Sequence, residues 1–177
     1  MLHFAAAVAE FLGLNAHTIS LSADGNRLYA GGSFSNIGGL RRRYLAALDV
    51  GSGAAVSGFD ARAASTVHAV ATSGTNSQIF AGGEFTSVNG VPRINVAALD
   101  ANGVLDPNFV ADTDTRDTNP NVEVDALAID GGQLYLGGNF LRVNGVSEVR
   151  LARVDAATGA VDKSFHASPS AAINAAW

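Results

Sequence analysis

The chain has 177 residues, of which 47% are hydrophobic and 15% are charged, so it can bury the core of a single domain spanning residues 1–177. Eleven basic residues against sixteen acidic ones give a net charge of −5, which argues against a nucleic-acid partner because nucleic acids select densely basic surfaces. Cysteine is absent and no apolar run reaches the length of a membrane span, so we expect neither thiolate metal sites nor membrane insertion.

The first residues resemble the end of a repeated unit. The segment AAVAEF, Ala6–Phe11, matches AAVSGF, Ala54–Phe59, which closes the first complete unit. A secretory signal peptide is a weaker interpretation, because this stretch has no basic start and Glu10 interrupts its apolar residues. We therefore predict that residues 1–11 are the tail of a preceding unit.

A motif of an aromatic residue, a glycine pair and a phenylalanine recurs three times along the chain. It reads LYAGGSF, IFAGGEF and LYLGGNF at residues 28–34, 79–85 and 134–140. The first glycines of the three pairs are 51 and then 55 residues apart, a period that suits a four-stranded propeller blade and exceeds that of common helical repeats. The chain is therefore predicted to consist of copies of one supersecondary unit.

Each copy divides into four short apolar segments separated by glycine-containing turns. The first copy has Asp24-Gly25 and Ser52-Gly53, and the later copies have Asn89-Gly90 and Asn144-Gly145. Such dipeptides favour β-hairpins because they tolerate positive φ. We predict four-stranded antiparallel meanders at residues 17–59, 67–109 and 122–165, with residues 173–177 starting a further one.

The third segments, YLAALDV from Tyr44 and INVAALDA from Ile94, are apolar without clean alternation, which indicates sheets covered on both faces. Stacking the meanders around an axis provides that cover. The predicted fold is therefore all-β, an incomplete β-propeller of three blades plus edge strands. Because closed propellers have four to eight blades, we expect open blade faces and self-association through them.

The glycine pairs lie inside the second strand of each unit. Glycine at such a position marks a bulge or the close approach of another backbone. A phosphate-binding loop is a weaker interpretation, because no Lys-Ser/Thr and no helix start follows the pairs. Aspartates end the third segments just before a turn, where we expect them to accept backbone hydrogen bonds; they are Asp49, Asp100 and Asp155.

The repeated pattern of aromatic, small residue, Gly-Gly, x, Phe, then Val-Asn-Gly, Leu-Ala-x-Leu-Asp, Thr-Gly and Asp-x-x-Phe resembles the delta-60 repeat, a β-propeller family. It is carried by Tyr29, Phe80 and Tyr135, by Phe34, Phe85 and Phe140, by the three aspartates above, and by Phe59, Phe109 and Phe165. The resemblance implies a secreted or surface-associated bacterial protein, and similar repeats build a fungal cortical polarity marker. The first unit departs from the pattern at Gly38, which replaces asparagine, and at Gly58.

An acidic insertion of about seven residues enters the link between the second and third units. It holds Asp112, Asp114 and Asp117, with Glu123 twelve positions into a loop counted from Asp112. An EF-hand is disfavoured, because Arg116 takes a ligand position and Asp117 stands where glycine is needed; an irregular calcium site at the three aspartates remains an alternative.

Propeller geometry places this insertion on the face that carries the turns between second and third strands. The basic cluster Arg41, Arg42 and Arg43 lies in one of those turns and is a candidate contact for an acidic glycan or protein partner. Because insertions grouped on one face of a repeat protein often mark its binding surface, we expect this face to make the contacts.

First strands are innermost in a propeller, so polar residues on them are candidates to line the central channel. His68 and Asp125 occupy equivalent positions there, with Ile19 and Asn174 as the expected counterparts in the neighbouring units. Such residues usually hold water. They also offer a general acid/base pair, although the sequence shows no nucleophile with supporting geometry.

We therefore expect a non-enzymatic binding or interaction module of an extracellular or cell-surface protein, with a protein or glycan partner and no required cofactor. Two alternatives stay open. One is a propeller lyase or hydrolase that uses the channel residues, and the other is a structural spacer.

Overall fold

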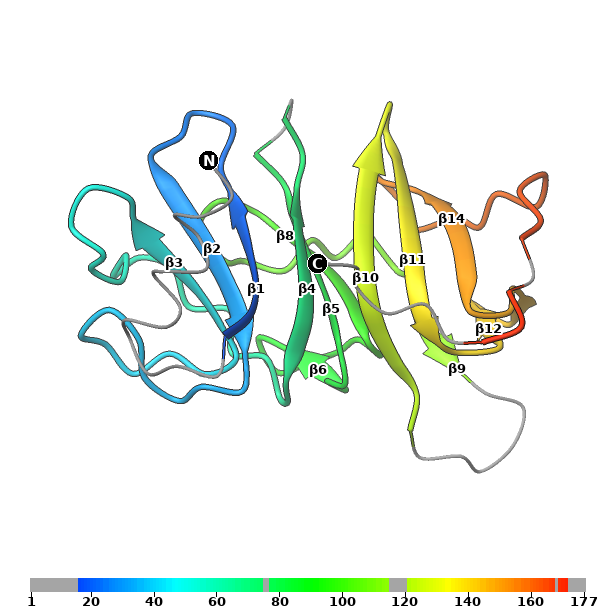
Figure 1. Ribbon diagram of the computed structural model, residues 1–177, viewed down its shortest axis with the longest axis horizontal. Coiled ribbons are helices and arrows are strands. Elements are labelled where there is room, and N and C mark those ends of the chain that lie inside the picture. Colours follow the sequence, from blue (N-terminus) through cyan, green and yellow to red (C-terminus); the bar gives the residue numbers. More distant parts are fainter. Residues whose placement is uncertain (1–15, 75–76, 115–120, 168, 172–177) are drawn as a thin grey trace.

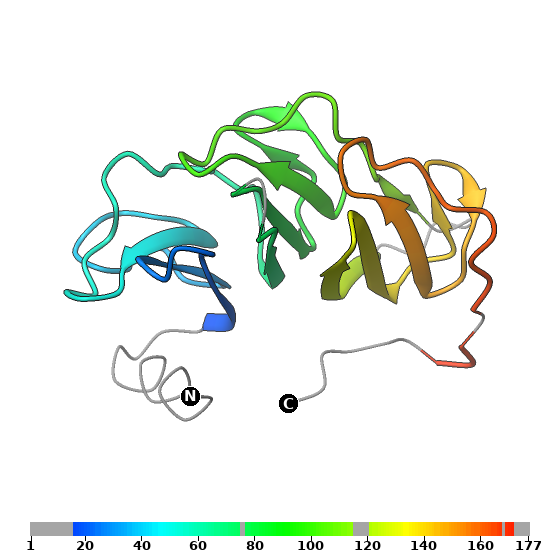
Figure 2. The same cartoon turned by 90° about the horizontal axis from the view of Figure 1, so that it is seen from above.

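The computed structural model describes residues 16–74, 77–114, 121–167 and 169–171, and all regular secondary structure within these ranges is β. Three antiparallel sheets stand side by side with their first strands innermost, and together they form an open arc (Figure 1, Figure 2). The prediction of an all-β, unclosed propeller is confirmed. No helix among the described residues has the length and apolar character needed to cross a membrane.

Each blade contains three main strands that follow the chain from the inside of the arc to the outside. The strand orders are β1-β2-β3, β4-β5-β8 and β10-β11-β14. Neighbouring strands in each sheet run antiparallel. The strands are β1 (Ala16–Leu21), β2 (Arg27–Gly32), β3 (Leu45–Asp49), β4 (Val67–Thr72), β5 (Ile79–Gly83), β8 (Val96–Leu99), β10 (Glu123–Asp130), β11 (Gln133–Asn139) and β14 (Leu151–Asp155).

The blades are held together by apolar side chains from facing sheets, as the lack of alternation in the third segments predicts. One buried cluster joins the first two blades and includes Tyr29 and Phe59 from blade 1 with Ile79 from blade 2. A second cluster joins blades 2 and 3 and includes Phe109 and Leu134. Burial of apolar area between sheets is therefore the main source of stability in the arc.

The sequence suggested that the Asn-Gly turns join the second and third strands directly. Instead, these turns lie at the tips of extra hairpins, made of two-residue strands, inside that connection. In blade 2 the hairpin is β6 (Ser87–Val88) with β7 (Val91–Pro92), and in blade 3 it is β12 (Arg142–Val143) with β13 (Val146–Ser147). The two-residue strand β9 (Thr113–Asp114), from the link between blades, pairs with β12.

The predicted fourth strand is reduced to a single antiparallel bridge in every blade. The bridges are Leu48–Ala55, Leu99–Leu105 and Val154–Val161. Turns bring each segment back to its sheet, and in blades 1 and 2 the chain then runs on to the first strand of the next blade. The outer edge of the arc is therefore made of bridged loops.

The outward face of blade 1 is more covered than the sequence suggested. On the outer face of blade 1, Phe34, Ile37 and Leu48 are each at most 5% exposed. Among the described residues, the exposed large apolar side chains lie at strand ends, in turns and in links; they are Leu21, Val50, Val91, Ile94, Val104 and Val110. Self-association through open faces stays a prediction.

Candidate functional site

The site is built from a bulge that the glycine pair produces in each innermost strand. The register between the first two strands slips by one residue at His17, His68 and Asp125, so each of these residues is the extra one in its strand. The second glycine makes the bulge possible, because a Cβ at Gly83 would lie 2.1 Å from the carbonyl oxygen of Thr66. Bulges redirect side chains, and here they aim them along the inner surface of the arc.

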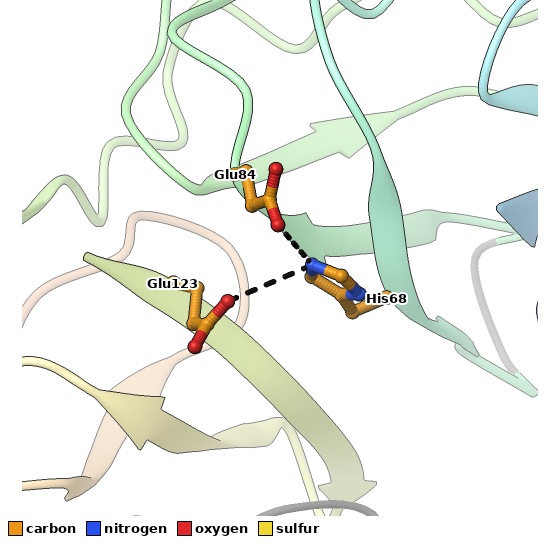
Figure 3. A group of neighbouring side chains, drawn as sticks. All are labelled: His68, Glu84 and Glu123. Carbon is orange, nitrogen blue, oxygen red and sulfur yellow. Dashed lines mark hydrogen bonds and ion pairs between the residues drawn. The ribbon is translucent and has the colours of Figure 1, made fainter. Parts of the chain in front are cut away.

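The side chains of His68, Glu84 and Glu123 converge on one point. His68 Nε2 lies 3.0 Å from Glu84 Oε1 and 3.8 Å from Glu123 Oε2 (Figure 3). His68 comes from β4, Glu84 directly follows β5, and Glu123 begins β10, so blades 2 and 3 both contribute. The three ligand-type atoms all lie within 4.8 Å of one another.

Two further titratable groups complete what we call the inner-strand cluster, defined as His17, His68, Glu84, Glu123 and Asp125. The His17 and His68 rings meet edge to face with centroids 5.4 Å apart, which brings in blade 1. Asp125 is the bulge residue of β10 and interacts electrostatically with His68 and Glu84. Three neighbouring blades thus place two imidazoles and three carboxylates together.

The cluster shifts the titration of several of its own members. Burial raises the pKa of Glu123, and the nearby Asp125 charge raises it further, while His68 acts in the opposite direction. Burial also raises the pKa of Asp125. Burial lowers the pKa of His17, and the neighbouring His68 adds to that shift. Negative charge is therefore unfavourable here unless a positive group joins the cluster.

The expected counterparts of His68 need one correction. The sequence suggested Ile19 as the equivalent residue in blade 1, but the bulge register assigns that place to His17, because Ala16 pairs with Gly32 and Thr18 with Gly31. His68 and Asp125 are equivalent, as expected. Asn174, the fourth expected channel residue, lies outside the described residues.

The acidic insertion is used in part to hold the link between blades. Asp112 accepts a hydrogen bond from the Ile94 backbone N–H at 2.7 Å, and Asp114 lies 3.8 Å from Arg142. Asp117 lies outside the described residues. These contacts place the link against the connections between second and third strands, as expected, and a calcium site at these three residues stays a prediction.

The arginine cluster lies in the β2–β3 connection. Arg41 and Arg43 are exposed, while Arg42 is half-buried and donates a hydrogen bond to the Ser57 carbonyl at 2.9 Å. Arg42 therefore has a structural contact across its own blade, and its two neighbours are left facing solvent. In Figure 1 the β2–β3 connection lies at the lower left, on the side of the molecule where β4 and β10 begin.

Sequence reasoning missed three members of the inner-strand cluster: His17, Glu84 and Glu123. The sequence did hold a signal for Glu84. It is the variable residue of its Gly-Gly-x-Phe motif, directly after the glycine that faces the bulge, so its side chain is placed beside the bulge residue. The spacing between bulge residue and second glycine would also have found His17, because His17 precedes Gly32 by the same number of residues as His68 precedes Gly83. Glu123 could not be found this way, since its approach to His68 depends on how two blades pack.

Two surface hollows lie elsewhere. One of about 430 Å³ is lined by residues such as Gln78, Asp100 and Asp106, and the other, of about 270 Å³, by residues such as Ser22 and Arg27. No cluster residue lines either hollow. The convergence of titratable groups, not the size of a hollow, therefore identifies the candidate site.

Comparison with known proteins supports the repeat. A family described as "Domain of unknown function (DUF5122) beta-propeller" matches residues 76–109 and 132–165. No curated protein matches the chain. Each matched segment covers the second strand, the small hairpin, the third strand and the outer segment of one blade, so blades 2 and 3 are β-propeller repeats.

Proposed function

We propose that this chain is a non-enzymatic binding module. Its contact surface is the side of the arc on which the inner strands β1, β4 and β10 begin. One observation carries the proposal: three blades place His17, His68, Glu84, Glu123 and Asp125 together on that side. Five titratable groups at one place are costly for a fold, because charges of one sign repel and burial removes their water. Such an arrangement is typical of a site that meets a ligand.

The partner we propose is a protein or a glycan that presents polar or cationic groups to this surface. The exposed Arg41 and Arg43 supply the opposite charge on the same side, so a partner with both acidic and basic groups suits it. The similarity of the sequence to delta-60 repeats supports an extracellular or cell-surface location, where propellers accompany adhesion modules.

The proposal is tested by binding to a glycan array and to a panel of purified extracellular matrix and cell-surface proteins. The parent chain is compared with a triple variant, His68→Ala, Glu84→Gln and Glu123→Gln. We expect at least one ligand to bind the parent and to lose about 10-fold or more in affinity with the variant. Equal binding by both proteins places the contact surface elsewhere and contradicts the proposal.

A second candidate is a propeller lyase or hydrolase that uses the same groups. The favouring observation is that Glu123 and Asp125, both with raised pKa, lie close to His68, as an acid and base pair would require. Turnover of polysaccharide or ester substrates by the parent, lost in Glu123→Gln, would favour this candidate. Absence of both turnover and binding would favour a structural spacer.

A further inference from the structure

We infer that His68, Glu84 and Glu123 form a binding site for a divalent transition-metal cation, with Zn²⁺ as the best fit. The inference deepens the proposed binding function, because it names a ligand for the same cluster. It rests on the convergence of one imidazole nitrogen and two carboxylate oxygens, contributed by β4, by the residue after β5 and by β10, in two blades.

The spacing of the ligand atoms is close to what the metal requires. Zn²⁺ binds nitrogen and oxygen at about 2.0–2.2 Å in tetrahedral sites, which separates neighbouring ligand atoms by about 3.3–3.6 Å. The two separations from His68 Nε2, 3.0 Å to Glu84 and 3.8 Å to Glu123, lie on either side of that value. Small rotations of the two glutamate side chains, which are 46% and 32% exposed, would complete the geometry.

The charge of the cluster favours a cation. Two of the three converging groups, Glu84 and Glu123, are carboxylates that lie beside the same His68 nitrogen. A divalent ion between Glu84 and Glu123 would replace the repulsion between the two carboxylates by attraction, and the His68 nitrogen would coordinate the same ion.

The donor set selects among metals. Calcium and magnesium prefer sites made of oxygen alone, whereas imidazole nitrogen suits zinc, iron, nickel and copper. Three protein ligands leave a fourth tetrahedral position open, as in zinc sites that bind a further molecule. A carboxylate or hydroxyl of the proposed partner would have access to that position, so the metal would join the module to its ligand.

Two of the ligands lie on strands, and the third, Glu84, directly follows one. Glu84 and His68 are fixed by the bulge opposite Gly83, while Glu123 opens the eight-residue strand β10, which packs beside β4. The His17 ring contacts the His68 ring edge to face. Because blade 2 and blade 3 both supply ligands, bound metal would also link the two blades and raise the unfolding temperature.

The test uses metal-free parent protein, titrated with ZnCl₂ in a calorimeter and with CoCl₂ in a spectrophotometer. We expect one Zn²⁺ per chain, weaker binding of Ca²⁺ and Mg²⁺, and visible absorption bands from tetrahedrally bound Co²⁺. His68→Ala, Glu84→Gln and Glu123→Gln should each weaken Zn²⁺ binding by about 10-fold or more. The glutamine substitutions keep the size of the side chain, and circular dichroism checks that each variant folds.

Two control variants remove the same residue types away from the cluster. His166→Ala removes an exposed histidine, and Asp130→Asn removes an exposed carboxylate at the far end of β10; both should bind Zn²⁺ like the parent. Binding that is equal in parent and ligand variants, or Co²⁺ spectra without tetrahedral bands, would overturn the inference.

The metal inference and the proposed function can fail separately. If Zn²⁺ does not bind but the triple variant loses its glycan or protein ligand, the binding function stands and the metal inference is wrong. If Zn²⁺ binds at one site but the triple variant keeps every partner, the metal inference stands and the proposed contact surface is wrong.

Discussion

At the residue scale, the two glycines of each pair have different tasks. A Cβ on the first glycine would meet the next blade: at Gly82 it would lie 2.8 Å from a Val124 methyl group. A Cβ on the second would meet the bulged strand of its own blade, as at Gly83 and Gly138. The first glycine therefore sets how closely blades pack, and the second sets the bulge that aims the site residue.

Gly83→Ala is expected to destabilise the fold by about 2–3 kcal/mol, because its Cβ would collide with the Thr66 carbonyl and with Val67 Cα, which are backbone atoms that cannot rotate away. Gly58→Ala is the matched control, since no atom lies within 4 Å of its Cβ, and it should change stability by less than about 0.5 kcal/mol. Urea unfolding of both variants measures the difference. Similar costs would show that Gly83 does not control the bulge.

Asparagine in the Asn-Gly turns fixes the extra hairpins to the rest of the blade. Asn89 Nδ2 donates to the carbonyls of Asp60 and Ala61 at 3.0 and 2.9 Å, and its Oδ1 accepts from the Leu105 N–H at 2.8 Å. Asn144 makes three hydrogen bonds in blade 3 with a different use of its amide: Nδ2 donates to the carbonyls of Val110 and Gly159, and Oδ1 accepts from the Asp112 N–H. In blade 1 the equivalent Gly38 has no room for a side chain, because a Cβ there would lie 2.3 Å from the Ala55 nitrogen.

Asn89→Ala is expected to cost about 2 kcal/mol, since it removes three hydrogen bonds and places alanine at a φ of 52°. Asn36→Ala, at an exposed asparagine that hydrogen-bonds only its neighbour Ser35 among the described contacts, is the control and should cost less than about 0.5 kcal/mol. Thermal melts followed by circular dichroism compare them. A small loss at Asn89 would mean that the turn is held by its backbone alone.

At the element scale, aspartate-centred turns keep the outer segments against their sheets. Asp49, Asp100 and Asp155 accept backbone hydrogen bonds from the turns that follow them, which confirms the structural interpretation of these residues. Blade 3 adds Asp162, which accepts from Ser164 N–H at 2.9 Å and from Arg153 Nε at 2.9 Å. These contacts replace the ladder that a complete fourth strand would supply.

Asp162→Asn should lower the unfolding temperature at pH 7 and leave it little changed near pH 2. Hydrogen bonds from Ser164, followed by that from Arg153, lower the pKa of Asp162 to about 2 from an ordinary value of 3.8. A lowered carboxyl pKa gives stability that is present above the ordinary pKa and is lost as pH falls through the folded-state pKa. The gap between parent and variant should therefore close between pH 4 and pH 2. A gap independent of pH would contradict this assignment.

The sequence predicted the repeated elements well, because the same strand, turn and glycine-pair patterns occur in three copies and each copy supports the interpretation of the others. The role of the glycine pairs follows from their place inside a strand, and the contacts of Gly82 and Gly83 agree with it. The small hairpins β6–β7 and β12–β13 were not predicted, because an Asn-Gly pair specifies a turn but not the length of the strands beside it. The meeting of His68 with Glu123 depends on the angle between two blades, which no local pattern encodes.

At the scale of the whole molecule, the arc is stabilised mostly between blades. In blades 1 and 2 an aromatic pair faces the blade that follows: Tyr29 with Phe59, then Phe80 with Phe109, with ring centroids 5.6 and 5.4 Å apart. All four of these side chains are at most 2% exposed. In blade 3 the corresponding pair, Tyr135 and Phe165, is half-buried, and Arg153 lies over the Phe165 ring at 5.0 Å.

This difference predicts unequal costs for one substitution at two equivalent positions. Phe109→Ala removes a side chain that blades 2 and 3 enclose completely, and it should destabilise the arc by about 3–5 kcal/mol. Phe165→Ala removes a half-buried ring and its contact with Arg153, and it should cost about 1–2 kcal/mol. Urea unfolding of the two variants, at a protein concentration where light scattering gives the same molar mass for each, measures both costs. If the two losses are equal, the enclosure of an aromatic pair by a following blade is not what stabilises the repeat, and stability must come from within single blades.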